Sequence, residues 1–125
     1  DWDAGHGEFY CGDVAEFADR GSARFDRVIA LGVLHHVDDL MAERILRSAS
    51  LLLKPGGRWI SHDPTRVPEQ SRWSRWMVDH DRGRFVREPD ALLALASPFF
   101  TRCQVVIDNA PLRIPYTEAI LVAER

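Results

Sequence analysis

Two adjacent histidines, His35 and His36, are the clearest candidates for acid–base chemistry in this sequence. They follow an apolar run, residues 27–31, that ends at Gly32. Because a histidine side chain titrates near neutral pH, either ring is able to take a proton from a bound substrate. The pair is therefore a candidate catalytic site that lies just after a predicted strand.

Two aspartates follow other predicted strands in the same way. Asp13 comes after residues 8–11, and Asp63 comes after residues 59–62. In an open α/β sheet, ligands bind outside the carboxyl ends of the strands, so we expect both aspartates near Gly32 at one edge. There Asp63 would bind a substrate hydroxyl or cation, or else only cap its loop. Many flavin, nucleotide and phosphosugar proteins share this pattern.

The elements that must position these side chains alternate between strand and helix. Three helices are predicted: one over residues 14–19, one from a cap at Asp38 or Asp39 to a stop at residues 54–57, and one over residues 89–96. Strands are predicted over residues 8–11, 27–31, 59–62, 103–108 and 116–123. The run 27–31 lacks polar alternation, which is typical of a strand buried on both faces. The last two strands are too close in sequence for a crossover helix, so they should form an antiparallel hairpin. The alternation predicts an α/β domain with a doubly wound, mostly parallel sheet.

Residues 64–88 form an unusually long connection between a strand and the next helix. Their position after a strand predicts a lid over the substrate. Trp73 and Trp76 have the spacing of a short amphipathic helix. We expect them to anchor this helix on the domain more readily than to stack on substrate, but both stay candidate substrate contacts. Arg84 and the neighbouring arginines would bind a phosphate or carboxylate, or pair with acidic residues of the same segment.

Composition narrows the function classes. The 125 residues suffice for one domain, and a net charge of −3 gives no general basic field for nucleic acid. No apolar run approaches the length of a membrane span. Cys11 and Cys103 have the spacing of neither a zinc site nor a disulfide framework, which favours a reducing cytoplasm.

Three segments resemble class I S-adenosylmethionine-dependent methyltransferases. Residues 25–37, FDRVIALGVLHHV, are similar to the family's fourth-strand motif, and residues 51–58, LLLKPGGR, to its helix-to-fifth-strand motif. The segment Gly12-Asp13-Val14 is similar to the family's adenine-contacting segment after the third strand. The resemblance implies a Rossmann-like fold with strand order 3-2-1-4-5-7-6 and S-adenosylmethionine as cofactor.

The resemblance also implies roles for particular residues. Asp13 would accept a hydrogen bond from the adenine amino group, with the backbone of Val14 nearby, unless it only caps the following helix. The backbone of Leu31 and Gly32 would pass beside the methionine end of the cofactor. In the family the paired-histidine position often packs at the start of a helix, so the resemblance leaves a structural role open for His35 and His36.

Two earlier motifs of the family are missing from this sequence: the glycine-rich turn after the first strand and the acidic residue that binds the ribose. Residues 1–7 leave no room for them. We therefore expect the chain, residues 1–125, to be the carboxyl-terminal part of a methyltransferase domain that is inactive alone. The strand at residues 8–11 would then lack its partner, and the strand at residues 27–31 would have an exposed edge.

The sequence thus predicts methyl transfer from S-adenosylmethionine to a small-molecule substrate, with no metal. It leaves open the oligomeric state and whether oxygen, nitrogen or carbon is methylated. Two alternatives remain at this point. One is a different Rossmann-like enzyme, such as a nicotinamide or nucleotide-sugar oxidoreductase, and the other is a degenerate methyltransferase fold that serves as an interaction module.

Overall fold

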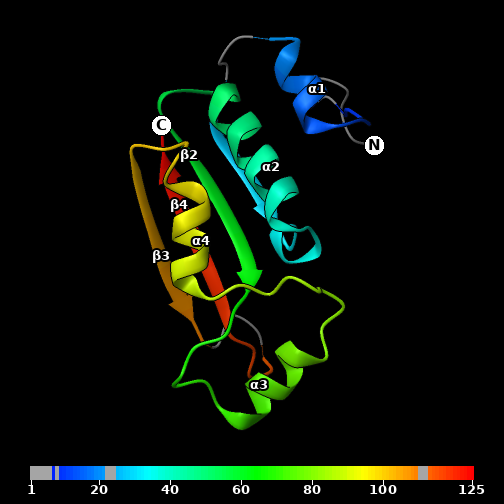
Figure 1. Cartoon of the computed structure of the whole chain (residues 1–125), viewed down its shortest axis with the longest axis vertical. Coiled ribbons are helices and arrows are strands. Elements are labelled where there is room, and N and C mark those ends of the chain that lie inside the picture. The colour runs from blue at the N-terminus through cyan, green and yellow to red at the C-terminus, as the bar shows by residue number, and fades with distance from the viewer. Residues whose placement is uncertain (1–6, 8, 22–24, 110–112) are drawn as a thin grey trace.

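The computed structural model describes residues 7, 9–21, 25–109 and 113–125. Its elements in chain order are α1 (Val14–Asp19), β1 (Phe25–Leu31), the short 3₁₀ helix η1 (Leu34–His36), α2 (Asp39–Leu52), β2 (Leu53–Pro64), α3 (Arg72–Asp79), α4 (Pro89–Ala96), β3 (Arg102–Asp108) and β4 (Glu118–Glu124). Helices α2 and α4 lie side by side against the sheet, and α3 lies beyond the carboxyl end of β2 (Figure 1).

The sheet has the strand order β1-β2-β4-β3. Strands β1 and β2 are parallel, and β4 is antiparallel to both β2 and β3. This order corresponds to strands 4-5-7-6 of the family order, which confirms the predicted α/β fold and the antiparallel hairpin. Because β4 is antiparallel to β2, the amino end of β4 meets the carboxyl end of β2.

The helices begin where the sequence predicts. The carboxylate of Asp38 accepts a hydrogen bond of 2.9 Å from Met41 N, which caps α2. Helix α4 starts with Pro89 in its first turn, where a missing N–H costs nothing. Helix α3 is capped by Ser71, whose side chain accepts a hydrogen bond from Ser74 N.

Strand β2 begins earlier than predicted. Residues 54–57 end the helix as expected, but they already belong to β2, which starts at Leu53. Gly56 N donates to Arg125 O, and Gly57 leaves room for the backbone of the neighbouring strand, because a Cβ there would lie 3.2 Å from Phe25 O. Pairing with β1 and the chain end therefore extends the strand over a segment that reads locally as a turn.

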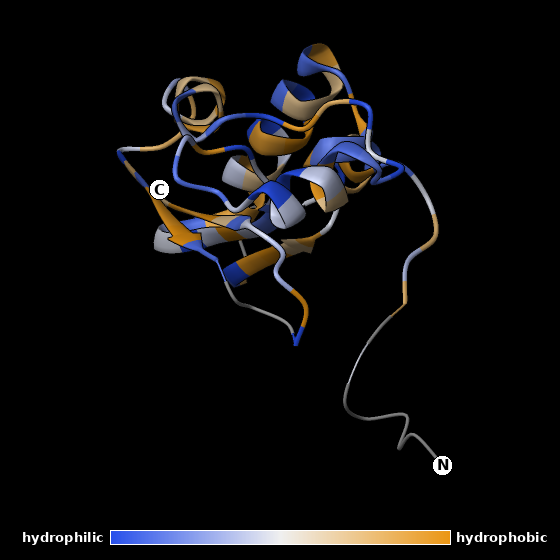
Figure 2. Cartoon of the chain, turned by 90° about the horizontal axis from the view of Figure 1, so that it is seen from below, coloured by the Kyte–Doolittle hydropathy of each residue, from blue (hydrophilic) through white to orange (hydrophobic). Residues whose placement is uncertain are grey.

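The hydrophobic core lies between the sheet and helices α2 and α4. Leu46, Leu53, Trp59, Leu92 and Leu121 are among its buried members. Figure 2 shows these helices on one face of the sheet.

The prediction that residues 27–31 are buried on both faces is wrong within the described part of the chain. Ile29 and Leu31 on β1 are 60% and 69% exposed, because no described helix covers their side of the sheet.

The predicted strand at residues 8–11 does not form over residues 9–11, and Glu8 lies outside the described residues. A strand requires an adjacent strand, and β1 is the edge of the described sheet.

No described helix combines the length and apolar character that crossing a membrane requires.

Candidate active site

A pocket of about 410 Å³ opens at the carboxyl end of β2. Its walls come from the loop after β1, the end of β2, the long connection before α4 and the segment leading into β4, and include Gly32, His35, His62, Asp81, Tyr116 and Glu118. This is the edge at which open α/β sheets bind ligands. The structure therefore brings together polar groups from four separate segments.

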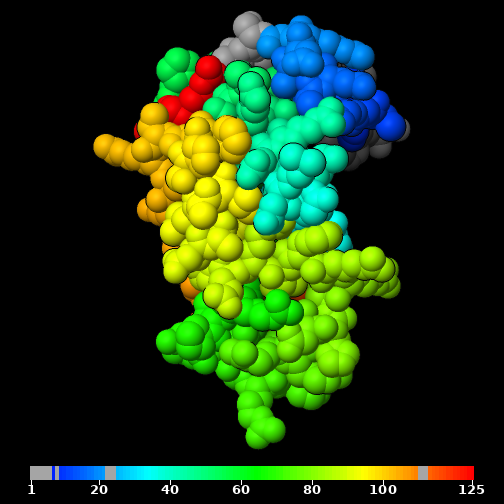
Figure 3. Space-filling view, viewed as in Figure 1, coloured from blue at the N-terminus to red at the C-terminus, as the bar shows by residue number. Residues whose placement is uncertain are grey.

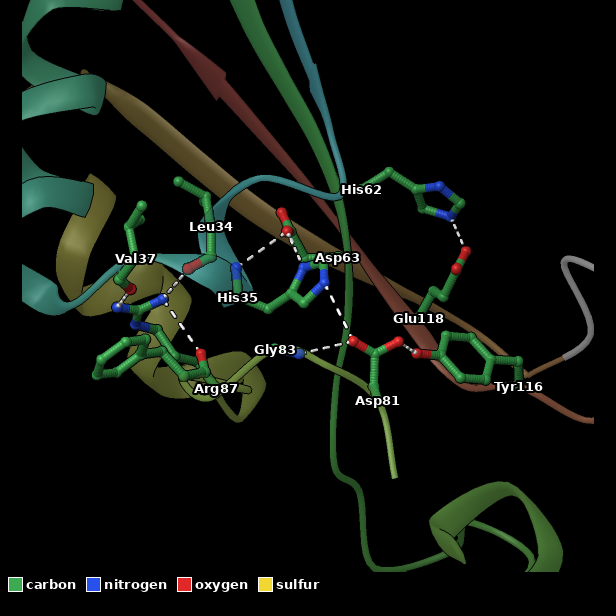
Figure 4. A network of polar contacts seen from close by, with 11 residues as sticks. Leu34, His35, Val37, His62, Asp63, Asp81, Gly83, Arg87, Tyr116 and Glu118 are labelled. Carbon is green, nitrogen blue, oxygen red and sulfur yellow. Dashed lines mark hydrogen bonds and ion pairs between the residues drawn. The ribbon is translucent and has the colours of Figure 1, made fainter. Parts of the chain in front are cut away.

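His35 and Asp63 form a buried pair at this pocket (Figure 4). His35 Nδ1 lies 2.9 Å from Asp63 Oδ1, which also accepts a hydrogen bond of 3.2 Å from His35 N. The two residues are only 6% and 2% exposed. Because a carboxylate only accepts hydrogen bonds, this short contact favours the tautomer of His35 that has its proton on Nδ1 and its lone pair on Nε2.

Asp81 lies on the other side of the same imidazole ring. Its Oδ1 is 3.4 Å from His35 Nε2 and accepts a hydrogen bond of 2.9 Å from Gly83 N, while its Oδ2 accepts one of 2.7 Å from the Tyr116 hydroxyl. Burial opposes ionisation of Asp81, but these hydrogen bonds and the charges of His35 and His36 outweigh it and lower its pKa. Burial and the Asp81 carboxylate raise the pKa of Tyr116, which keeps the phenol protonated.

A second histidine–carboxylate pair lines the far side of the pocket. His62 Nε2 contacts Glu118 Oε2, and both residues lie on the sheet face opposite α2 and α4. Burial and repulsion from Asp108 and Asp63 raise the pKa of Glu118, although His62 acts in the opposite direction.

Arg87 fixes the backbone that carries His35. Its buried guanidinium donates hydrogen bonds to the carbonyl oxygens of Leu34 and Val37, on either side of the histidine pair, and to Asp39 Oδ1 at 2.8 and 2.9 Å. This arginine therefore connects the end of the long connection to η1 and the start of α2.

The sequence missed the roles of Asp81, Tyr116, His62, Glu118 and Arg87. A partial signal existed for three of them. His62 directly precedes Asp63, and the predicted hairpin already placed the start of its last strand, with Tyr116 and Glu118, beside that strand end.

The two histidines of the predicted catalytic pair face different surroundings. Their rings lie 4.0 Å apart, but His36 is exposed and lines a separate hollow with Met41, Arg44 and Phe85. The structure thus places His35, and not His36, against the pocket with Asp63.

The four residues predicted to contact the cofactor lie in two places. Gly32 borders the pocket with a positive φ of 64°, and a Cβ there would meet only His35 Cε1, at 3.5 Å. Its neighbour Leu31 is exposed. Val14 is the first residue of α1, and Asp13 caps that helix through Ala15 N and pairs with Arg44 Nη2 on α2 at 3.2 Å, so both lie away from Gly32.

The other predicted substrate contacts are on the surface of the long connection, which Figure 3 shows as a lobe at the opposite end of the molecule from α1. Trp73 and Trp76 are 58% and 49% exposed and stack on each other at 5.1 Å. The expectation that they anchor α3 is wrong, because Ser74 and Val78 form its buried face. Arg84 is also exposed.

Residues 5–96 match the family model of a methyltransferase domain. No curated protein sequence matches the chain. Three similar solved structures are the apo S-adenosylmethionine-dependent methyltransferase SibL (18% identity, TM-score 0.68, 93% of this chain and 35% of that one), the pyocyanin biosynthetic protein PhzM (15%, 0.66, 91% and 33%) and human N-acetylserotonin methyltransferase in complex with S-adenosylmethionine (20%, 0.61, 94% and 33%).

This chain spans about a third of the length of those structures. At these identities the likeness establishes the fold, and the family model, which covers most of the chain, establishes membership. The sheet order, the pocket at the strand ends and the family match agree, and the chain belongs to the methyltransferase domain family.

Proposed function

We propose that the protein containing this chain transfers a methyl group from S-adenosylmethionine to a hydroxyl oxygen of a small molecule, with His35 as general base. The observation that carries this proposal is the orientation of His35: Asp63 holds Nδ1 at 2.9 Å, and the ring lines the pocket. A hydroxyl becomes a strong nucleophile as it loses its proton, so a base at this position favours oxygen among the three possible acceptor atoms.

The chain's own residues would act as follows. Asp63 fixes the tautomer in which Nε2 has a free lone pair, and it stabilises the imidazolium that forms when Nε2 takes the hydroxyl proton. Leu31 and Gly32 would border the cofactor, since the positive φ at Gly32 and its lack of a side chain allow close approach of a ligand to the backbone. Asp13 and Val14 would contact its adenine. When bound, S-adenosylmethionine supplies an electrophilic methyl group on its sulfonium.

The two alternatives that the sequence left open are less well supported. The match to a methyltransferase domain favours methyl transfer over nicotinamide or nucleotide-sugar oxidoreduction. A buried histidine–aspartate pair beside a pocket favours catalysis over a degenerate interaction module, because burying such a pair is costly without a use for it.

The test uses the full-length protein and a panel of small-molecule hydroxyl compounds with S-adenosylmethionine labelled in its methyl group. We expect label in an ether product, and we expect His35→Gln to lower kcat by about 10²- to 10⁴-fold while the cofactor Kd stays unchanged. His80→Gln is the matched control, since His80 is exposed on α3's end. Label in an amine, or full turnover by His35→Gln, would contradict the proposal.

A further inference from the structure

The imidazole ring of His35 is held between two carboxylates (Figure 4). Asp63 contacts Nδ1 at 2.9 Å and Asp81 lies 3.4 Å from Nε2. A neutral imidazole has one N–H and can donate to only one of them, whereas an imidazolium donates to both. With Nδ1 already committed to Asp63, the approach of Asp81 to Nε2 is attractive when the ring is protonated and repulsive when it is neutral.

The residues around Asp81 keep it charged and aimed at the ring. Tyr116 and Gly83 N donate hydrogen bonds to its two oxygens, and they lower its pKa. Asp81 therefore stays ionised over the pH range in which a histidine changes charge. The hydrogen-bond geometry of the carboxylate is fixed, and the proton on His35 is the variable.

Other charged groups face the two residues from every side. The ring of His36 is tilted against that of His35, with the ring centroids 4.0 Å apart, and Arg87 donates a hydrogen bond to the neighbouring Leu34 carbonyl. His62 and Glu118 line the opposite wall of the pocket. Among the described residues, none of these four forms a hydrogen bond with Nε2, so Asp81 is the charged group whose interaction with the ring changes when Nε2 is protonated.

We propose that Asp81 is a positioning residue that couples the closure of residues 80–84, the part of the long connection around it, to the protonation of His35. These residues close against the imidazolium and are released from the neutral ring, while the hydrogen bonds of Phe85 N and Arg87 hold the end of the connection in either state. Asp81 belongs to the connection and His35 to the loop after β1, so their contact joins the two segments across the pocket.

This inference rests on the proposed function for its place in the reaction. His35 Nε2 takes the proton of the acceptor hydroxyl while the oxygen bonds to the methyl carbon and the carbon–sulfur bond breaks, leaving S-adenosylhomocysteine. The new Nε2–H then donates a hydrogen bond to Asp81 while the ether product leaves, and the proton afterwards passes to solvent. Only neutral His35 can accept the hydroxyl proton. Protonation of His35 at low pH therefore inhibits the reaction, and it also keeps residues 80–84 closed.

The first test measures hydrogen exchange of the full-length protein, which needs no turnover. After correction for intrinsic rates, peptides covering residues 80–87 should exchange several-fold more slowly at about pH 5.5 than at about pH 8, on either side of the histidine range. Asp81→Asn should abolish this difference. Asp79→Asn is the matched control, since Asp79 pairs with Arg66 on the same connection and should keep the difference.

The second test measures the pH profile of kcat/KM. Asp81→Asn should move its acidic limb to lower pH, because removal of an opposite charge destabilises the imidazolium. A uniform loss of activity at every pH, or an exchange pattern in Asp81→Asn that matches the wild type, would overturn the coupling. If Asp81→Asn fails to fold, Tyr116→Phe removes one hydrogen bond that aims Asp81 and should weaken the pH dependence of exchange.

The two proposals fail separately. Exchange that depends on Asp81 and pH in a protein that transfers no methyl group would refute the proposed function and keep the coupling. Methyl transfer with a pH-independent connection would do the reverse.

Discussion

Gly83 lies directly against the imidazole ring of His35. A Cβ at position 83 would lie 2.0 Å from His35 Cδ2 and 2.8 Å from its carbonyl oxygen, distances that real side chains do not tolerate. Phe85 N donates to that same carbonyl at 3.0 Å, so the backbone of the long connection follows His35 closely. Glycine at position 83 is therefore a requirement of this contact.

We expect Gly83→Ala to displace the connection from His35. Forcing a methyl group into this contact should cost about 1–3 kcal/mol of stability or move residues 81–85 away from the ring. In the full-length protein, kcat should fall at least roughly tenfold, equivalent to 1.4 kcal/mol, while the cofactor Kd changes little. Gly7→Ala is the control, since a Cβ at Gly7 meets nothing within 4 Å. Wild-type kinetics in Gly83→Ala would contradict the contact.

Arg87→Lys should destabilise the chain although it keeps the charge. A lysine has one compact ammonium group, and it cannot reach Asp39 and the carbonyls of Leu34 and Val37 together. Leaving a buried acceptor unsatisfied costs about 1–3 kcal/mol, which denaturant unfolding would measure. Arg84→Lys, on the exposed surface of the same connection, should stay within about 0.5 kcal/mol of the wild type. Equal losses in both variants would refute the special role of Arg87.

Local signals were sufficient to predict most of the fold. The Asp38 cap and the helical spacing that follows it predict α2, and the short separation of the last two strands predicts their hairpin. The early start of β2 at Leu53 was not predictable, because it depends on pairing with Phe25 and on the contact of Gly56 with Arg125, both distant in sequence.

The candidate site was predictable to a similar degree. His35 follows β1, and Asp63 lies at the carboxyl end of the neighbouring parallel strand β2, so the topology brings them together once the strands are known. Asp81 and Arg87 belong to a connection without helical or strand periodicity around them, and only tertiary contacts select them from their acidic and basic neighbours. The exposure of Trp73 shows the same limit, since spacing predicts a face but not which face is buried.

Glu118→Gln should stabilise the chain more at neutral than at acidic pH. The pKa of Glu118 is raised in the folded state, chiefly by burial, so folding favours the protonated carboxyl. Stability associated with this group is therefore present below its unfolded pKa and is lost as pH rises through the folded pKa. The neutral amide removes that loss. Melting temperatures of the wild type and Glu118→Gln, measured from acidic to neutral pH, would check this prediction. A larger stabilisation of the variant at acidic pH would contradict it.

Asp13→Ala and Asp13→Ser separate the two roles of Asp13. Serine caps helices about as well as aspartate, and alanine costs about 1 kcal/mol at this position, so only the alanine variant should lower the melting temperature. If Asp13 also binds adenine, both variants should weaken cofactor binding by about 1–3 kcal/mol in the full-length protein. Wild-type cofactor affinity in the serine variant would leave Asp13 as a cap of α1 alone.

Residues 68–79, which include α3, should determine substrate choice and not cofactor affinity. Helix α3 packs on the domain through Ser74 Oγ, which lies 2.7 Å from Thr117 Oγ1 and accepts a hydrogen bond from Gln70 Nε2, and Met77 reaches the pocket wall. A glycine–serine linker of equal length in their place keeps Asp81, Gly83 and Arg87.

We expect that replacement to leave the cofactor Kd of the full-length protein within about a factor of three, or roughly 0.7 kcal/mol, and to abolish turnover of the native substrate. The double variant Trp73→Ala, Trp76→Ala is the matched comparison, because these exposed rings are outside the pocket wall. If the double variant alone reproduces the loss of turnover, the tryptophans contact substrate directly. If the linker variant keeps its turnover, or loses cofactor binding instead, α3 is part of the scaffold and the substrate is selected elsewhere.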